Sequence, residues 1–194
     1  MSADASLASG IEQARRWLTE ADRVVVLTGA GISTDSGIPD FRGPKGLWTR
    51  NPEAEKMATL QVYVADPEVR RRAWRWRLET RAAQPAPNAG HAALVDLERL
   101  GRLDTLVTQN VDGLHQSAGS DPDRVVEIHG TLREVECLGS TLAVYPVAAM
   151  VPIAKEQGAR IVILNGEPTE MDPIADLVLH GSIGEMLPKL VPDR

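Results

Sequence analysis

The stretch that decides the fold is LTGAGISTDSGIPDFRG, residues 27–43, which overlaps the end of the apolar run RVVVLT at 23–28. A short β-branched run that ends in glycine is typical of a strand buried on both faces of a parallel sheet. Ligands of such sheets bind beyond the carboxyl ends of the strands. There, Gly29 and Gly31 would let the backbone turn sharply and approach a phosphate, with free N–H groups directed at its charge. The spacing departs from a dinucleotide fingerprint, because Thr34 stands where the third glycine belongs.

The rest of the chain alternates helices with strands. Helical periodicity and helix punctuation predict helices at about 7–21, 53–83, 88–101, 145–157 and 183–190, and apolar runs predict further strands at 103–109, 125–130, 159–165 and 175–181. This alternation predicts an α/β fold, an open and doubly wound parallel sheet of the Rossmann-like kind. No linker or repeat interrupts the pattern, so residues 1–194 are predicted to form a single domain.

Composition and charge exclude several classes of protein. The net charge of −6 disfavours a general nucleic-acid binder, and the run RRRAWRWR at 70–77 is interpreted as a solvated helix face with its tryptophans packed inward. No apolar run approaches the roughly 18 residues that cross a membrane, and the N-terminus does not resemble a secretory signal. Cys137 is the single cysteine, so no disulfide can form within the chain. A reducing, cytoplasmic location is therefore predicted.

Polar side chains lie at or just past the ends of three further predicted strands, at the edge of the sheet where Gly29 is expected. They are Gln109, Asn110, Asp112 and His115 in TQNVDGLHQ, His129 in EIHG, and Asn165 and Glu167 in NGEPT. Each cluster alone could be ordinary turn chemistry, since Asn, Asp and Gly favour turns. Together with the glycine turn they indicate a dinucleotide site, in which an amide and a carboxylate could hold ribose hydroxyls.

These blocks resemble the sirtuins, the NAD-dependent protein deacylases. GAGISTDSGIPDFR at 29–42, TQNVDGLH at 108–115 and HG at 129–130 are similar to the three signature blocks of that family, in the same order. PNAGH, GSTLAVYPVA, NGEPT and the final GSIGEMLP are also similar, so the resemblance covers nearly the whole chain. It implies NAD as co-substrate, an acetylated lysine of a protein as substrate, and nicotinamide and O-acyl-ADP-ribose as products.

The resemblance also implies a role for individual residues. His129 would be the general base, removing a proton from a ribose hydroxyl after the acyl oxygen has displaced nicotinamide, a task that suits an imidazole. His91 and His180 are interpreted as capping or packing residues, and His115 as a support of its own loop. The implied cofactor-binding residues are Gly29, Ala30, Gly31, Ile32, Ser33 and Arg42 for the pyrophosphate, Asp40 and Phe41 for the shape of the cofactor loop, Gln109, Asn110, Val111 and Asp112 for nicotinamide and its ribose, Gly139, Ser140, Asn165, Gly166 and Glu167 for the phosphate and adenosine side, and Ile183 for adenine.

One part of the family pattern is missing. Sirtuins carry a small zinc lobe with two Cys-x-x-Cys pairs after the catalytic histidine, and a structural zinc needs four ligands. Here HGTLREVECLGSTLAVYP offers only Cys137, a doubtful metal ligand, because Ser140 stands where the second cysteine would fall. A Phe-Gly-Glu-type substrate loop is absent as well. Three explanations fit the apparent deletion near 137–140: a real or engineered deletion, a faulty gene model, or residues omitted from the sequence. Both flanks match the family blocks closely, which favours omitted residues.

The missing loop keeps alternatives to deacetylation open. One is a non-catalytic NAD-binding remnant, and another is an ADP-ribosyltransferase or a plain NAD glycohydrolase. Acyl preference is predicted only coarsely: Trp74 and Arg77 stand where family members that favour acidic acyl groups have Tyr-x-x-Arg. Removal of acetyl groups is therefore the prediction, and the target protein cannot be inferred.

Overall fold

The structure is a computed structural model that describes residues 3–131, 150–169 and 171–192. Its centre is a three-stranded parallel sheet of order β1-β2-β3, formed by Val24–Thr28, Leu103–Thr108 and Val125–Glu127. A second, two-stranded parallel sheet pairs β4 (Val162–Asn165) with β5 (Leu177–His180). The predicted α/β class with parallel strands is confirmed. The described strands fall into two sheets because no hydrogen-bonded ladder among them joins β1 to β4.

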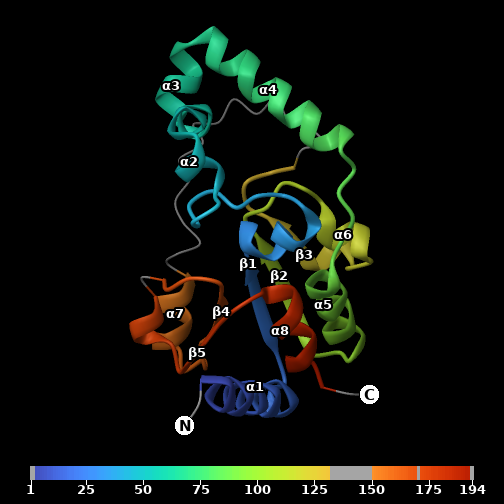
Figure 1. Cartoon of the computed structure of the whole chain (residues 1–194). Coiled ribbons are helices and arrows are strands. Elements are labelled where there is room, and N and C mark those ends of the chain that lie inside the picture. The colour runs from blue at the N-terminus through green and yellow to red at the C-terminus, as the bar shows by residue number, and fades with distance from the viewer. Residues whose placement is uncertain (1–2, 132–149, 170, 193–194) are drawn as a thin grey trace.

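Helices connect and cover these strands (Figure 1). α5 packs on β2 and on α8, and α1 packs on α8 and β5. At the end of the molecule away from α1, a lobe of helices lies beyond the carboxyl ends of the central strands. The helices are α1 (Ala3–Glu20), α5 (Ala89–Arg99), α6 (Leu114–Ala118), α7 (Met150–Glu156) and α8 (Ile183–Leu190), with α2 (Leu47–Arg50), η2 (Pro52–Ala58), α3 (Leu60–Ala65) and α4 (Pro67–Ala82) in the lobe and the 3-10 turns η1 (Ala30–Ser36), η3 (Pro122–Arg124) and η5 (Asp172–Ile174) elsewhere.

The predicted helical stretch at 53–83 is divided into η2, α3 and α4. The last division falls at Asp66, whose carboxylate accepts hydrogen bonds from the N–H groups of Glu68 and Val69. Pro67 follows at the first helical position, where its missing N–H costs nothing. This Asp-Pro pair therefore ends one helix and starts the next.

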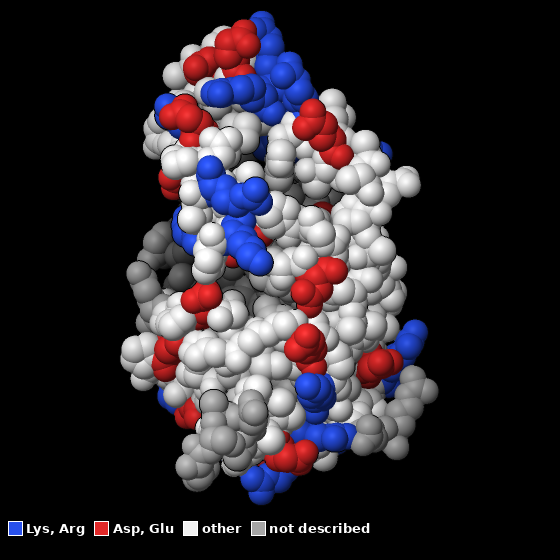
Figure 2. Space-filling view, viewed as in Figure 1, with Lys and Arg blue, Asp and Glu red and all other residues white. Residues whose placement is uncertain are grey.

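The tryptophan prediction for this lobe was wrong at Trp74, whose side chain is 42% exposed. The next turn of α4 presents Leu78, which is 61% exposed. Among the described residues, the main neighbours of α4 are the small elements α3 and η2, and its buried residues are Val69 and Ala73, so little surface is at hand to cover a tryptophan. Figure 2 shows basic side chains gathered at this end of the molecule.

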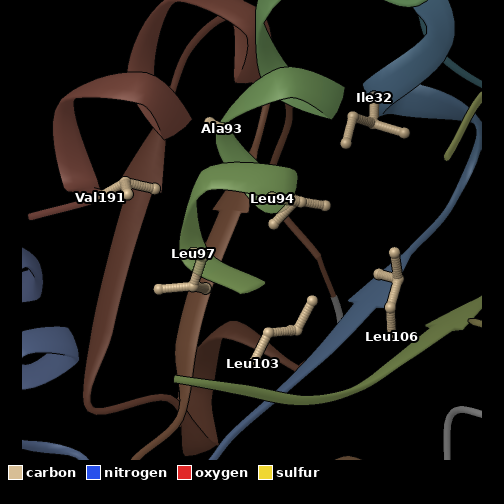
Figure 3. Close-up of a cluster of buried hydrophobic side chains, with 7 residues drawn as sticks. All are labelled: Ile32, Ala93, Leu94, Leu97, Leu103, Leu106 and Val191. Atoms are coloured by element: carbon tan, nitrogen blue, oxygen red, sulfur yellow. The ribbon is translucent and has the colours of Figure 1, made fainter. Parts of the chain in front are cut away.

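The main core joins the central sheet to the helices on one face (Figure 3). Leu106 of β2 and Leu94 of α5 are fully buried, and Ile32 of η1 is 2% exposed. Because Ile32 belongs to this core, the glycine-rich segment after β1 is anchored from beneath. The cluster comprises Ile32, Ala93, Leu94, Leu97, Leu103, Leu106 and Val191.

Asn88 connects the same segment to α5. Its carboxamide oxygen accepts hydrogen bonds from the N–H groups of Gly90 and His91, and His91 Nδ1 accepts the N–H of Asn88, which completes a capping box. The predicted N-cap is thus confirmed. The Asn88 Nδ2 also donates to the Ile32 carbonyl at 2.7 Å and to Ser36 Oγ at 3.0 Å. A single residue therefore starts α5 and fixes η1 against it.

Candidate functional site

The carboxyl ends of the three central strands meet at one edge. Thr28 and Thr108 are register partners in β1 and β2. Beyond them, the N–H of Gln109 donates to the Thr28 carbonyl at 3.0 Å, and the N–H of Ile128 donates to the Thr108 carbonyl at 3.1 Å. The segments that begin at Gly29, Gln109 and His129 are therefore neighbours, as expected for a parallel sheet.

The glycine-rich segment after β1 forms the 3-10 turn η1. Gly29 and Gly31 were expected to allow a sharp turn of the backbone, and this expectation was wrong. Gly29 has φ −135°, and Gly31 also lacks a left-handed conformation; Gly37, at φ 84°, has one. The sharp turn comes from 3-10 winding, with the Ile32 N–H donating to the Gly29 carbonyl at 3.2 Å. Gly31 is instead needed for close approach: a Cβ there would lie 3.3 Å from Ile183 Cδ1 and 3.6 Å from Asn165 Oδ1.

The Gly31→Ala variant tests this contact. A Cβ at 3.3 Å from Ile183 Cδ1 requires this methyl group to move by a few tenths of an ångström, and overpacking of this kind costs about 1–3 kcal/mol. We expect the affinity for ADP-ribose to fall about tenfold, at 1.4 kcal/mol per decade, as measured by calorimetry. Adding Ile183→Val removes the Cδ1 methyl and should restore most of the affinity. An unrescued double variant would contradict the steric explanation.

A buried polar network joins the first and second sequence blocks. The Asn110 Nδ2 donates to the Gly29 carbonyl at 3.1 Å and to Ser33 Oγ at 3.2 Å. The Ser33 hydroxyl in turn donates to Asp112 Oδ2 at 2.8 Å, and the other Asp112 oxygen accepts the Leu114 N–H at 3.0 Å. Ser33 is fully buried and Asn110 is 9% exposed. The site therefore has a fixed arrangement of amide, hydroxyl and carboxylate at the sheet edge.

His129 is exposed and lies beyond the end of β3. Its Nδ1 is 3.0 Å from the carbonyl oxygen of Gln109. A carbonyl oxygen only accepts hydrogen bonds, so Nδ1 carries the proton and, in the neutral ring, Nε2 carries the lone pair. The structure thus leaves a proton-accepting nitrogen at the edge where the other segments meet.

The cofactor-loop residues lie on the lobe side of η1. The Arg42 guanidinium carbon lies 4.6 Å from the centre of the Trp48 ring, and the Phe41 ring is 4.9 Å from the same ring. Asp40 accepts the Gly43 N–H at 2.9 Å, which closes the turn. Trp48 was missed by sequence reasoning, where its aromatic character was the only available signal. It holds Arg42 by a cation–π contact.

The remaining predicted residues are placed less uniformly. Asn165 lies beside Gly31, but its Nδ2 donates to the Glu167 carbonyl at 2.7 Å, and the Glu167 side chain is exposed. Ile183 begins α8 against Gly31. The described segments contain no cluster of three or more His, Cys, Asp or Glu side chains suited to a metal. Also expected were Ala30, Val111 and Gly166, which follow β1, β2 and β4, and Gly139, Ser140 and Cys137, which lie outside the described residues.

Two histidines are buried below the site. His91 is fully buried and His115 is 1% exposed, with their ring centres 4.9 Å apart. Burial, with a smaller contribution from His91, lowers the pKa of His115 to about 4, although Asp112 opposes the shift. Burial likewise lowers the pKa of His91. Both rings are therefore neutral at pH 7, and the packing and loop-supporting roles expected from sequence agree with their positions.

This buried pair predicts acid sensitivity. The unfolded chain protonates His115 near its ordinary pKa of 6.5, whereas the folded protein does so only near 4, so the unfolded state binds more protons in between. Stability should be fully present above pH 6.5 and should fall by about 3 kcal/mol as the pH drops towards 4. Urea unfolding at pH 7.5, 6 and 5 measures this loss. The His115→Gln variant should show a flatter dependence; an equally steep one would assign the loss to other groups.

Comparisons with known proteins agree with this geometry. Residues 29–161 match the profile described as the Sir2 family. The chain is 38% identical to NAD-dependent protein deacetylase 2 of Streptomyces coelicolor, over 90% of this chain and 98% of that protein. It is 35% identical to NAD-dependent protein deacylase 2 of Pyrobaculum aerophilum, over 91% and 92% of the two chains.

Solved structures give the same result. The crystal structure of a Sir2 homolog–NAD complex matches with a TM-score of 0.74 and 30% identity, over 92% of this chain and 91% of that one. A Sir2 complex with a deacetylated peptide and 3′-O-acetyl ADP-ribose matches with a TM-score of 0.77 and 27% identity, over 93% and 96%. The Streptomyces alignment extends over 237 positions, more than the 194 residues of this chain, so the relative has residues without a counterpart here.

Proposed function

The chain belongs to the Sir2 family, and we propose that it is an NAD-dependent protein deacetylase that transfers the acetyl group of a lysine to ADP-ribose and releases nicotinamide. The observation that carries the proposal is the meeting of the Gly29, Asn110 and His129 segments at one sheet edge. Curated relatives at 34–38% identity over most of the chain are named as enzymes of this type.

The residues present fit NAD. Gly31 leaves room where a side chain would touch Ile183, and η1 follows β1 directly, so its backbone lies at the carboxyl edge of the sheet. Asn110 and Asp112, both bonded to Ser33, would hold the nicotinamide half, and Arg42 would pair with the pyrophosphate through its charged fork. When bound, NAD supplies an electrophilic ribose carbon, from which nicotinamide departs.

His129 would act as the general base. Its Nδ1–H donates to the Gln109 carbonyl. This hydrogen bond fixes the orientation of the ring and keeps the lone pair on Nε2. The exposed ring can then take a proton from a ribose hydroxyl without the cost of charging a buried imidazole. The buried His91 and His115 cannot do this, since burial holds them neutral and out of reach of substrate.

Zinc remains an expectation drawn from the family resemblance. A structural zinc needs four ligands, generally thiolate or imidazole, and Cys137 is the only cysteine of the sequence. The residues present therefore do not fit a complete zinc site, and no step of the mechanism depends on one. Within the described residues, no helix is both long and apolar enough to span a membrane. A cytoplasmic location and the absence of a nucleic-acid partner are part of the proposal.

Nicotinamide release tests the function. The purified protein should release nicotinamide from NAD only when an acetyl-lysine peptide is added, with O-acetyl-ADP-ribose detected by mass spectrometry. Release without peptide would favour an NAD glycohydrolase, and ADP-ribose attached to protein would favour an ADP-ribosyltransferase. NAD binding by calorimetry without any release would favour the non-catalytic remnant, while no NAD binding would contradict every one of these functions.

A further inference from the structure

A continuous chain of hydrogen bonds runs beneath the site from α6 to the Asn110 backbone. His115 Nε2 lies 2.9 Å from Thr28 Oγ1, at the end of β1. The Thr28 hydroxyl is hydrogen-bonded to Thr108 Oγ1 at 2.8 Å, at the end of β2. Thr108 Oγ1 also accepts the Asn110 N–H at 3.1 Å. His115, Thr28 and Thr108 are all at least 93% buried, so water does not compete for these bonds.

Each group in this chain can both donate and accept, since a hydroxyl has one hydrogen and two lone pairs, and a neutral imidazole has one N–H and one bare nitrogen. His115 Nε2 bonds the Thr28 hydroxyl in either tautomer, as a donor to its oxygen or as an acceptor of its hydrogen. His115 Nδ1 has no hydrogen-bond partner in the described part of the chain, so the ring joins the chain through Nε2. The chain thus requires a hydrogen-bonding group at the Nε2 position.

Asn110 is the point where this chain meets the site. Its backbone N–H donates to Thr108 Oγ1, the last member of the chain, and its side-chain Nδ2 donates to the Gly29 carbonyl and to Ser33 Oγ. A shift of the Asn110 backbone would therefore move the amide away from Ser33 and, through Ser33, disturb the contact to Asp112.

We propose that His115 is a positioning residue for the nicotinamide side of the site, fixing through Thr28 and Thr108 the backbone turn that carries Asn110. The inference rests on the proposed function, because it assigns Asn110 and Asp112 to nicotinamide and its ribose. In this role His115 acts through its hydrogen bond and not only through its volume. A leucine would fill a similar volume, but only a side chain with a hydrogen-bonding group at the Nε2 position would complete the hydrogen-bond chain.

Three variants separate positioning from packing. His115→Leu keeps the bulk and removes the hydrogen-bonding group, His115→Gln keeps an amide that can donate or accept at a similar reach, and Thr28→Val removes the intermediate hydroxyl at nearly constant shape. We would measure kcat and KM for NAD in acetyl-peptide-dependent nicotinamide release, and the Kd of ADP-ribose, which lacks nicotinamide, by calorimetry. His115→Leu and Thr28→Val should lose about three- to tenfold in kcat/KM, the effect of one buried neutral hydrogen bond. The ADP-ribose affinity should fall less than kcat/KM, because ADP-ribose keeps the ribose but lacks nicotinamide, and His115→Gln should approach wild type.

Equal losses of kcat/KM and ADP-ribose affinity would show a purely structural role and overturn the inference, as would an unaffected His115→Leu variant. If that variant does not fold, Thr28→Val makes the same test. Wild-type protein that releases no nicotinamide would contradict the proposed function instead. In that case binding alone still tests the inference. Thr28→Val should weaken NAD binding more than ADP-ribose binding, and an unchanged ratio of the two affinities would overturn the inference.

Discussion

Replacing His129 with alanine should lower the steady-state rate of deacetylation, and with it the steady-state release of nicotinamide, by about 10²- to 10⁴-fold, the usual contribution of a general base. The loss should appear in kcat for deacetylation, because the proton-accepting Nε2 is removed. Affinity for NAD should change little, since the described contacts of the His129 ring are to the Gln109 carbonyl and not to the glycine segment or the Asn110 network. Product analysis by mass spectrometry and NAD calorimetry on the same preparation separate these two effects.

His180→Ala is the matched control. His180 is also an exposed histidine at the end of a parallel strand, but it belongs to β5 and lies 3.6 Å from the Asp172 carboxylate. A surface pair of this kind contributes little to stability, so the control should keep nearly full activity. If both variants retained wild-type rates, His129 would not be the base; if both lost activity equally, the effect would not be specific to the site.

The Leu106→Ala variant should lose about 2–5 kcal/mol of unfolding free energy, the cost of a cavity at a fully buried leucine. Leu106 lies in the middle of β2 and shares its cluster with Leu94 and Leu97 of α5 and with Ile32 of η1 (Figure 3). The total unfolding free energy of a typical domain is only about 5–15 kcal/mol, so this loss would be a large fraction of the stability. The cavity should also loosen η1 and weaken NAD binding.

Urea unfolding measures the change, with Leu78→Ala as its control. Leu78 is 61% exposed on α4, so its truncation should change stability by less than about 0.5 kcal/mol. Both changes remove the same atoms, and burial is the difference between them. Equal losses for the two variants would contradict the assignment of the core to the β2–α5 interface.

Much of the fold could be predicted from local signals. The carboxamide of Asn88 caps α5 as its residue type suggests, and α8 spans Ile183–Leu190 as the apolar spacing indicates. The β-branched runs became β1 and β2 with almost the predicted bounds. These elements are set by neighbours within a few residues, which is why sequence alone suffices. Trp74 failed for the opposite reason, because its burial depends on how much surface the rest of the lobe supplies.

The candidate site divides in the same way. Its residue types and their order, and hence the family, are determined by the sequence: GAGIS, TQNVD and HG each lie at or just past the end of a predicted strand. Sequence could not assign their physical tasks. Gly31 is small because Ile183, 152 positions later, packs against it, and Asn110 is fixed by Ser33 of η1, 77 positions earlier. The proton on His129 Nδ1, the neutrality of His115 and the Trp48 contact to Arg42 likewise arise only from side chains that meet in space. Hydrogen bonds and desolvation act over a few ångströms between residues distant in the chain, so only the tertiary structure decides them.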